Sequence, residues 1–236
     1  MTARGVVAHA VVATLLLAGA ADATSRGPAS RGAADERRDL DLVASAQPSD
    51  QRREDSDVVV GETMVREDAL KADAVATTTT SCHGCRGDST VVQVLYVPGP
   101  SSARFDNVAS AWTQDCWDCS AAALAVQVVV IGPGTRARPT NRALSMGGAC
   151  ATCVTATAAF QLVVQVDAVG RLPDAALAEV AAWVEAEASA LRTAVVTPVT
   201  PRRAERASSR SLGELRRVVV RALDGRTRSA RVAVTR

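Results

Sequence analysis

The sequence predicts an α+β protein in which antiparallel β-hairpin repeats form a sheet or small sandwich, followed by one or two helices. Three Cys-x-x-Cys pairs begin 34 residues apart, and a glutamine in an apolar run follows each pair at a constant distance. After the last repeat, apolar residues recur at helical spacing. The expected segments are a signal peptide (1–23), a disordered charged linker (24–72), the repeat domain (73–168), an amphipathic helix (169–193), a linker (194–210) and a short helix with a basic tail (211–236).

The N-terminal 23 residues have the pattern of a secretory signal. Arg4 provides a positive start, and residues 6–18 are mostly apolar but shorter than the roughly 20 residues that span a bilayer. Small residues form Ala-x-Ala cleavage patterns that end at Ala20 and Ala23. We therefore predict a secreted or cell-surface protein that contacts a membrane only through this segment, if it stays uncleaved.

Residues 24–72 are rich in Ser, Arg, Asp, Glu and Ala and show no sustained period. Such a composition buries too little apolar surface to offset the entropy of ordering the chain. A short run of valines at 58–60 has no apolar neighbours in this segment. The segment is therefore predicted to be disordered.

The internal repeat extends beyond the cysteines. The pairs are Cys82/Cys85, Cys116/Cys119 and Cys150/Cys153. Eleven residues after the first cysteine of each pair lies Gln93, Gln127 or Gln161, and nine residues before it lies Asp73, Asn107 or Asn141. The glutamines are expected either to form a hydrogen-bonded amide ladder or to face solvent.

Each repeat is predicted to be a β-hairpin whose tight turn is Cys-x-x-Cys. After Cys119, alternate residues separate onto two faces, and the valine density of residues 126–130 favours a strand. The ends of a β-turn lie within about 7 Å at Cα, a distance that a disulfide can bridge. Three hairpins would give about six strands, enough for a stable sheet.

Two helices are expected after the repeats. Residues 172–191 place apolar side chains on one side, after a Pro173-Asp174 start. Residues 212–223 follow the capping-box pattern Ser211-x-x-Glu214. Between them, Thr-Pro pairs and arginines indicate a linker, and the arginine-rich end of the chain is expected to be a soluble, flexible tail rather than a binder of acidic polymers.

The six cysteines have three interpretations. In an exported protein, regularly spaced pairs are typical of structural disulfides, and we favour the local pairing within each Cys-x-x-Cys. Zinc binding is the second interpretation, although all-cysteine sites use two pairs and three pairs would leave one unused. Thiol–disulfide exchange is the third, but catalytic pairs open a helix, whereas strand-like runs follow these.

The sequence gives little support to an enzyme. His9 and His83 are the two histidines, and His9 lies in the expected signal segment. Phosphate-binding loops, zinc-protease motifs and nucleophile elbows are missing. We therefore expect an exported non-enzymatic structural or interaction protein without a catalytic residue, metal or cofactor, and thiol–disulfide redox or zinc binding is the alternative. The expected partner is a second copy or an envelope component, and not a specific nucleic acid.

The second repeat has the fullest pattern, with alanines alternating on both sides of its cysteines. It resembles repeats of the form N-x-A-x-A-x-N-x-x-C-x-x-C-x-T-x-A-x-A-x-Q in uncharacterised exported bacterial proteins. The residues that match best are Asn107, Ala109, Ala111, Cys116, Cys119, Ala121, Ala123, Ala125 and Gln127. The first repeat departs from the pattern, because threonines precede its cysteines and no alanine alternation follows them. The resemblance implies a repeat architecture and no particular activity.

Overall fold

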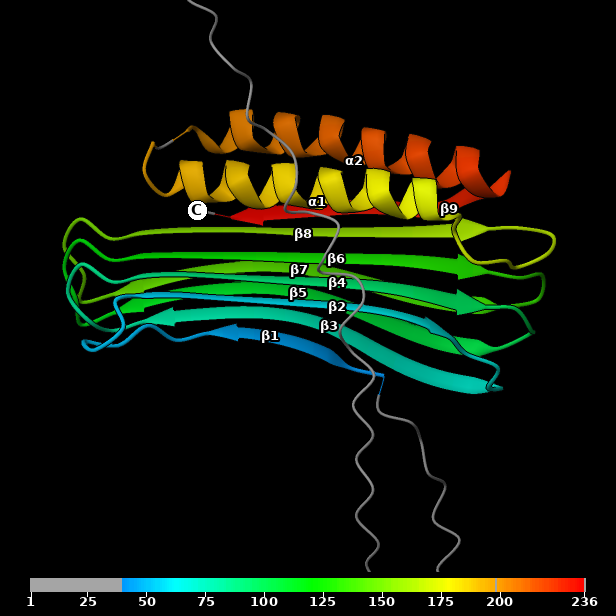
Figure 1. Ribbon diagram of the computed structural model, residues 1–236, viewed down its shortest axis with the longest axis horizontal. Helices are drawn as coiled ribbons and strands as arrows, with labels where there is room; N and C mark the ends of the chain where they lie inside the picture. Colours follow the sequence, from blue (N-terminus) through cyan, green and yellow to red (C-terminus); the bar gives the residue numbers. More distant parts are fainter. Residues whose placement is uncertain (1–39, 198, 236) are drawn as a thin grey trace, which may run out of the picture. The chain divides into compact units, whose positions relative to one another are not determined.

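The computed structural model describes residues 40–197 and 199–235, which form a parallel β-solenoid of four coils followed by two helices and a final strand (Figure 1). Each coil contributes one strand to each of two facing sheets. The first sheet contains β1 (Leu42–Ala46), β3 (Ala69–Thr80), β5 (Ser102–Gln114) and β7 (Arg136–Gly148). The second sheet contains β2 (Glu54–Met64), β4 (Arg86–Val97), β6 (Ser120–Ile131), β8 (Val154–Gln165) and β9 (Arg226–Thr235).

The predicted antiparallel hairpins are wrong. The strands on either side of a Cys-x-x-Cys turn lie in different sheets, so they face each other across the core. Each strand instead pairs in parallel with its equivalent in the next coil, as β4 does with β6 and β6 with β8. This register aligns Gln93, Gln127 and Gln161 along the solenoid. The tight turn therefore joins two sheets rather than two neighbouring strands.

Small side chains fill the space between the sheets near the cysteine turns. Buried alanines from both sheets form this part of the core: Ala44, Ala74, Ala76, Ala109, Ala111, Ala121, Ala123, Ala125 and Ala159. Towards the opposite edge of the coils the core residues are larger, with Phe105, Leu95 and Ile131 almost fully buried. Alternation along each strand therefore sends one set of side chains into this core.

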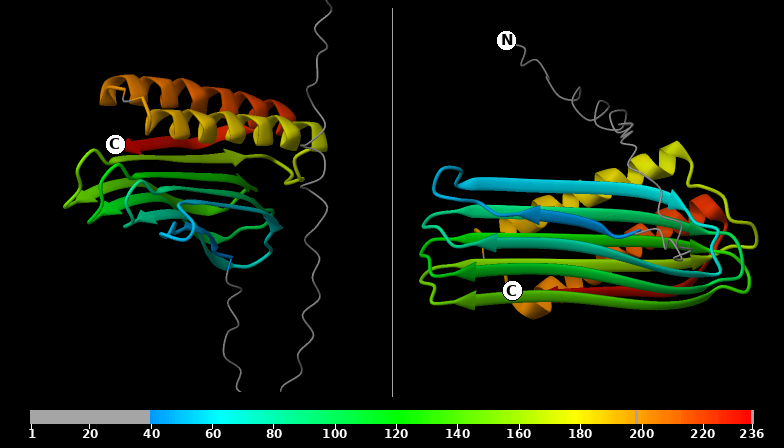
Figure 2. Two further views of the ribbon diagram at one scale, coloured as in Figure 1. Left: turned by 60° about the vertical axis from the view of Figure 1, so that its left-hand side comes forward. Right: turned by 90° about the horizontal axis from the view of Figure 1, so that it is seen from below.

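Helices α1 (Asp174–Ala194) and α2 (Pro201–Leu223) cover the outer face of the second sheet (Figure 2). Phe160 meets the ring of Trp183 edge to face, with centroids 5.0 Å apart, and Leu215 is fully buried. Because β6 has the core on one side and the helices on the other, nearly all of its residues are buried. We call the second sheet the covered sheet and β1-β3-β5-β7 the open sheet. Neither helix of the described chain has the length and hydropathy that crossing a membrane requires.

The expected segment boundaries also change. The predicted signal peptide lies outside the described residues, but the segment expected to be a disordered linker contains β1, β2 and the start of β3. Its acidic residues take part in the fold, because the carboxylates of Asp57 and Asp55 accept hydrogen bonds of 2.6 Å from the backbone amides of Ser45 and Gln47. Polar composition alone therefore mispredicted this coil.

The C-terminal segment is more ordered than the sequence indicated. The expected linker 194–210 contains the first half of α2, which begins at Pro201, where proline is favoured because the first helical amides need no intrahelical partner. The expected flexible tail forms β9, which pairs antiparallel with β8. Val232 and Val234 of β9 pack against the core beneath the helices, and this burial orders the strand.

Candidate functional site

The three Cys-x-x-Cys turns stack along one edge of the solenoid. Each pair forms a disulfide within its own turn, with Cα separations of 5.5, 6.3 and 5.8 Å in chain order. Backbone hydrogen bonds join successive turns: Gly84 N–H donates to Trp117 O at 3.0 Å, and Asp118 N–H donates to Ala151 O at 3.1 Å. The turns are therefore held in register by the same hydrogen bonding that joins the strands.

The third residue of each turn adopts a left-handed backbone conformation, with φ of 66° at Gly84, 53° at Asp118 and 59° at Thr152. Glycine and aspartate tolerate this region well, whereas β-branched threonine does not. The Thr152 hydroxyl compensates by accepting a 3.1 Å hydrogen bond from Asp118 N–H and donating one to Ala151 O at 2.6 Å. All three turns consequently share one shape despite their different sequences.

The second and third turns bring four sulfur atoms together. Cys116 Sγ lies 3.5 Å from Cys150 Sγ and 3.7 Å from Cys153 Sγ. The sulfurs of these three residues and Cys119 all lie within 4.8 Å of one another. Cys116 and Cys119 are buried, whereas the last pair is partly exposed. We call these four residues the cysteine cluster; in the described chain, Cys82 and Cys85 do not belong to it.

The His83 side chain of the first turn contacts Trp117 of the second turn. Its ring lies 5.1 Å from the indole of Trp117, and its Nδ1 accepts a 3.3 Å hydrogen bond from Trp117 N–H. The side chain thus continues the alignment of the first two turns. His83, which lies between Cys82 and Cys85, therefore packs the first turn against the second.

The three glutamines form a buried amide ladder. Gln127 Nε2 donates to Gln93 Oε1, and Gln161 Nε2 donates to Gln127 Oε1, each at 2.7 Å. Every Nε2 also donates to a backbone oxygen across the core: Leu40, just before β1, at 2.6 Å, Ala72 of β3 at 3.2 Å and Phe105 of β5 at 3.2 Å. Of the two expected arrangements, the ladder is the one present, and the amides tie the two sheets together.

The asparagine positions form a second, shorter ladder. Asn107 Nδ2 donates to Asn141 Oδ1 at 2.8 Å, and Asn141 Nδ2 donates to Ala159 O at 2.7 Å. Asp73 does not continue this row, because the register places Ala74 opposite Asn107. Asp73 points outward and pairs with Lys71. The first repeat is therefore offset by one residue at this position.

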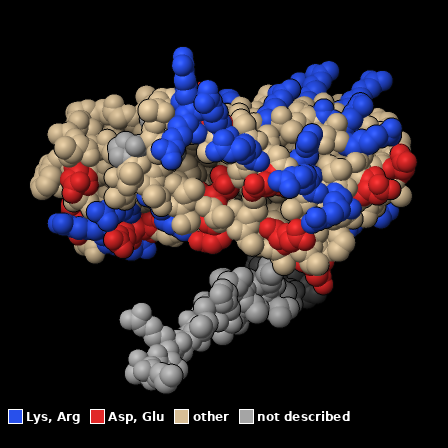
Figure 3. Space-filling model, turned by 90° about the horizontal axis from the view of Figure 1, so that it is seen from above, with Lys and Arg blue, Asp and Glu red and all other residues tan. Residues whose placement is uncertain are grey.

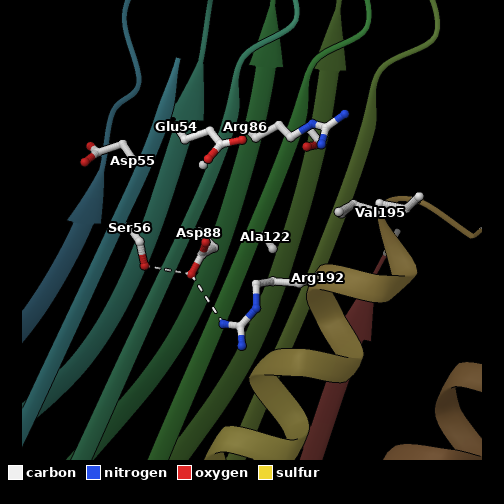
Figure 4. Close-up of a pocket in the computed structure, with 11 residues that line it drawn as sticks. Glu54, Asp55, Ser56, Arg86, Asp88, Ala122, Arg192 and Val195 are labelled. Carbon is white, nitrogen blue, oxygen red and sulfur yellow. Dashed lines mark hydrogen bonds and ion pairs between the residues drawn. The ribbon is translucent and has the colours of Figure 1, made fainter. Parts of the chain in front are cut away.

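A charged groove of about 410 Å³ lies between the covered sheet and the C-terminal end of α1 (Figure 4). Asp88 accepts a 3.0 Å hydrogen bond from Ser56 Oγ and lies 3.7 Å from the guanidinium of Arg192. Arg192 also pairs with Glu185 at 2.7 Å. The groove could not be predicted from local sequence, because Asp88 and its partner Arg192 are more than one hundred residues apart in the chain.

Arginines gather on the helical side of the molecule (Figure 3). The solvent-facing side of α2 presents Arg202, Arg203, Arg206, Arg210, Arg216 and Arg217. Its buried side rests on the covered sheet through residues such as Leu215 and Val219. The basic charge of the C-terminal region is thus displayed on a packed helix.

Compared with protein-family models, curated proteins and solved structures, the chain matches none of them.

Proposed function

We propose that the protein is an exported, non-enzymatic structural protein that self-associates through the outer edge of β2. The observation that supports this is an asymmetry between the two ends of the covered sheet. At one end β9 pairs with β8, whereas no described strand pairs with the outer edge of β2. An unpaired strand edge offers backbone donors and acceptors to another chain.

The other three sheet edges have features that discourage pairing. At the short edge strand β1, Asp57 and Asp55 occupy backbone amides. Strand β7 contains Pro139, whose carbonyl accepts a 2.8 Å hydrogen bond from Arg231. Strand β9 contains three arginines. Proline and charged side chains are common protections of sheet edges, so β2 is the edge best suited to pairing.

Strand β2 is self-complementary when two copies pair antiparallel about its central residue, Val59. In that register Val58 of each copy lies opposite Val60 of the other, and both side chains are exposed in the single chain, at 61% and 62%. Asp57 lies opposite Gly61, and no acidic residue lies opposite another. No like charges therefore face each other across this strand pair. Because the same strand pairs with itself, the result is a dimer with two-fold symmetry.

The oligomeric state tests self-association. Sedimentation velocity of the full chain from about 1 to 100 μM should show a concentration-dependent dimer, a range that covers ordinary reversible affinities. The double variant Val58→Lys/Val60→Lys should be monomeric, because it places four positive charges side by side in the dimer. Val43→Lys is the matched control, an exposed valine (53%) in β1, the strand of the same coil that lies in the open sheet. A monomeric wild type, or equal dimerisation of both variants, would overturn the proposal.

Export is tested separately from assembly. The proposal rests on the signal-like composition of residues 1–23 and on the resemblance of the repeats to exported bacterial proteins. Intact mass spectrometry of protein from its native host should find an N-terminus just after Ala20 or Ala23. A mature chain that retains Met1 in the cytosol would contradict export and leave the β2 edge proposal standing.

A further inference from the structure

The cysteine cluster has the ligand set of a structural zinc site. We propose that, when its two disulfides are reduced, Cys116, Cys119, Cys150 and Cys153 bind one Zn²⁺. Zinc prefers four thiolates in a tetrahedron with Zn–S distances of about 2.3 Å, which places the sulfurs about 3.8 Å apart. Cys116 Sγ already lies near this distance from both sulfurs of the other pair, at 3.5 and 3.7 Å, and all four sulfurs lie within 4.8 Å of one another.

Stacking of the coils is what preforms this arrangement. The Cys116 carbonyl accepts a 3.3 Å hydrogen bond from Ala151 N–H, so the two turns are fixed by backbone contacts that do not depend on the sulfur–sulfur bonds. Reduction therefore frees four thiols on a framework that stays assembled. This also answers the objection that three pairs leave one unused, because Cys82 and Cys85 remain outside the cluster and keep their own disulfide or thiols.

The disulfide and metal-bound forms exclude each other, because the same sulfurs serve both. With a phosphine reductant, each disulfide and one water molecule give two thiols, and the phosphine leaves as its oxide. Binding of Zn²⁺ to four thiols releases four protons, so the affinity should fall as the pH is lowered. The oxidised protein should bind no zinc at this position, and the proposal holds whether or not the chain self-associates.

Cobalt provides the direct measurement. The full chain, reduced without oxygen and titrated with Co²⁺, should bind one equivalent with the intense visible bands of a tetrahedral thiolate site, and Zn²⁺ should displace it. The variant Cys116→Ser/Cys150→Ser should lose these bands. The matched control is Cys82→Ser/Cys85→Ser, which removes an equivalent pair from the same edge and should still bind one equivalent.

Thiol protection supplies a second readout that does not depend on how well a variant folds. In the reduced wild type, bound zinc should shield the four cluster cysteines from alkylation, while Cys82 and Cys85 react. Absence of stoichiometric binding, uniform alkylation of all six cysteines, equal binding by oxidised protein, or loss of binding in the control variant would each overturn the proposal.

Discussion

Replacing Gln127, the central glutamine of the amide ladder, should destabilise the fold more than replacing Gln161, the last glutamine of the ladder. Both Gln127→Leu and Gln161→Leu remove a 3.2 Å bond to a backbone oxygen and a 2.7 Å bond to the preceding glutamine. Gln127→Leu additionally removes the acceptor of Gln161 Nε2. Gln161→Leu instead removes an Oε1 atom that is buried and has no hydrogen-bond partner. The two variants thus differ only in whether the Oε1 atom that is removed had accepted a hydrogen bond.

The magnitude follows from that difference. A buried hydrogen bond contributes about 1 kcal/mol, and a buried polar atom without a partner costs about 1–3 kcal/mol. Gln127→Leu should therefore lower the free energy of unfolding by about 2 kcal/mol more than Gln161→Leu does. The apolar gain of leucine over glutamine is similar at both sites, which are almost fully buried, and cancels in the comparison.

Guanidinium unfolding followed by far-ultraviolet circular dichroism, with the disulfides intact, measures both variants under the same conditions. The dependence of the unfolding free energy on guanidinium concentration should be the same for both variants, and Gln127→Leu should unfold at the lower midpoint concentration. If the two variants lose equal stability, or if Gln161→Leu loses more, the ladder does not distribute hydrogen bonds as described.

Two further predictions concern a titrating group and a close backbone contact. Burial raises the pKa of Glu187, although its hydrogen bond from Ser211 Oγ at 2.5 Å opposes the rise. A raised folded-state pKa means that stability falls as the pH rises through the carboxyl range. Glu187→Gln lacks this carboxyl group, so its thermal stability relative to wild type should rise between about pH 4 and pH 7. A difference in Tm that stays constant over this range would contradict the prediction. At Gly132 an added β-carbon would collide with the carbonyl oxygen of Pro98, so Gly132→Ala should lose about 1–3 kcal/mol in thermal unfolding. Gly99→Ala, with open space around it, should stay within about 0.5 kcal/mol, and equal losses would refute the contact.

The sequence predicted the repeat but not the direction in which its strands pair. Alternation such as Ala121, Ala123 and Ala125 occurs in parallel and antiparallel strands alike. The apolar run 126–131 contained the missing signal, because strands buried on both faces are typical of parallel sheets covered by helices. A tight turn between two strands suggested a hairpin, whereas here it joins facing sheets.

The first coil was missed for a different reason. Its acidic residues suggested disorder, but Asp55 and Asp57 act as hydrogen-bond acceptors for a neighbouring strand, a role that composition does not reveal. The cysteine cluster was missed for a related reason. In separate hairpins, equivalent cysteines 34 residues apart would have no defined neighbours, whereas in a solenoid they lie in adjacent coils. The sequence thus predicted the repeats and the helices better than it predicted how the coils stack.

The fold, the amide ladder and the proposed metal site all depend on the stacking of equivalent turns in adjacent coils. The variant Cys119→Ser/Cys153→Ser leaves Cys116 and Cys150, whose sulfurs lie 3.5 Å apart, as the only cysteines of their turns. Mild oxidation followed by mass spectrometry of non-reduced tryptic peptides should identify an intramolecular Cys116–Cys150 disulfide in nearly every chain. Two free thiols, or only cross-links between chains, would show that these turns are not neighbours.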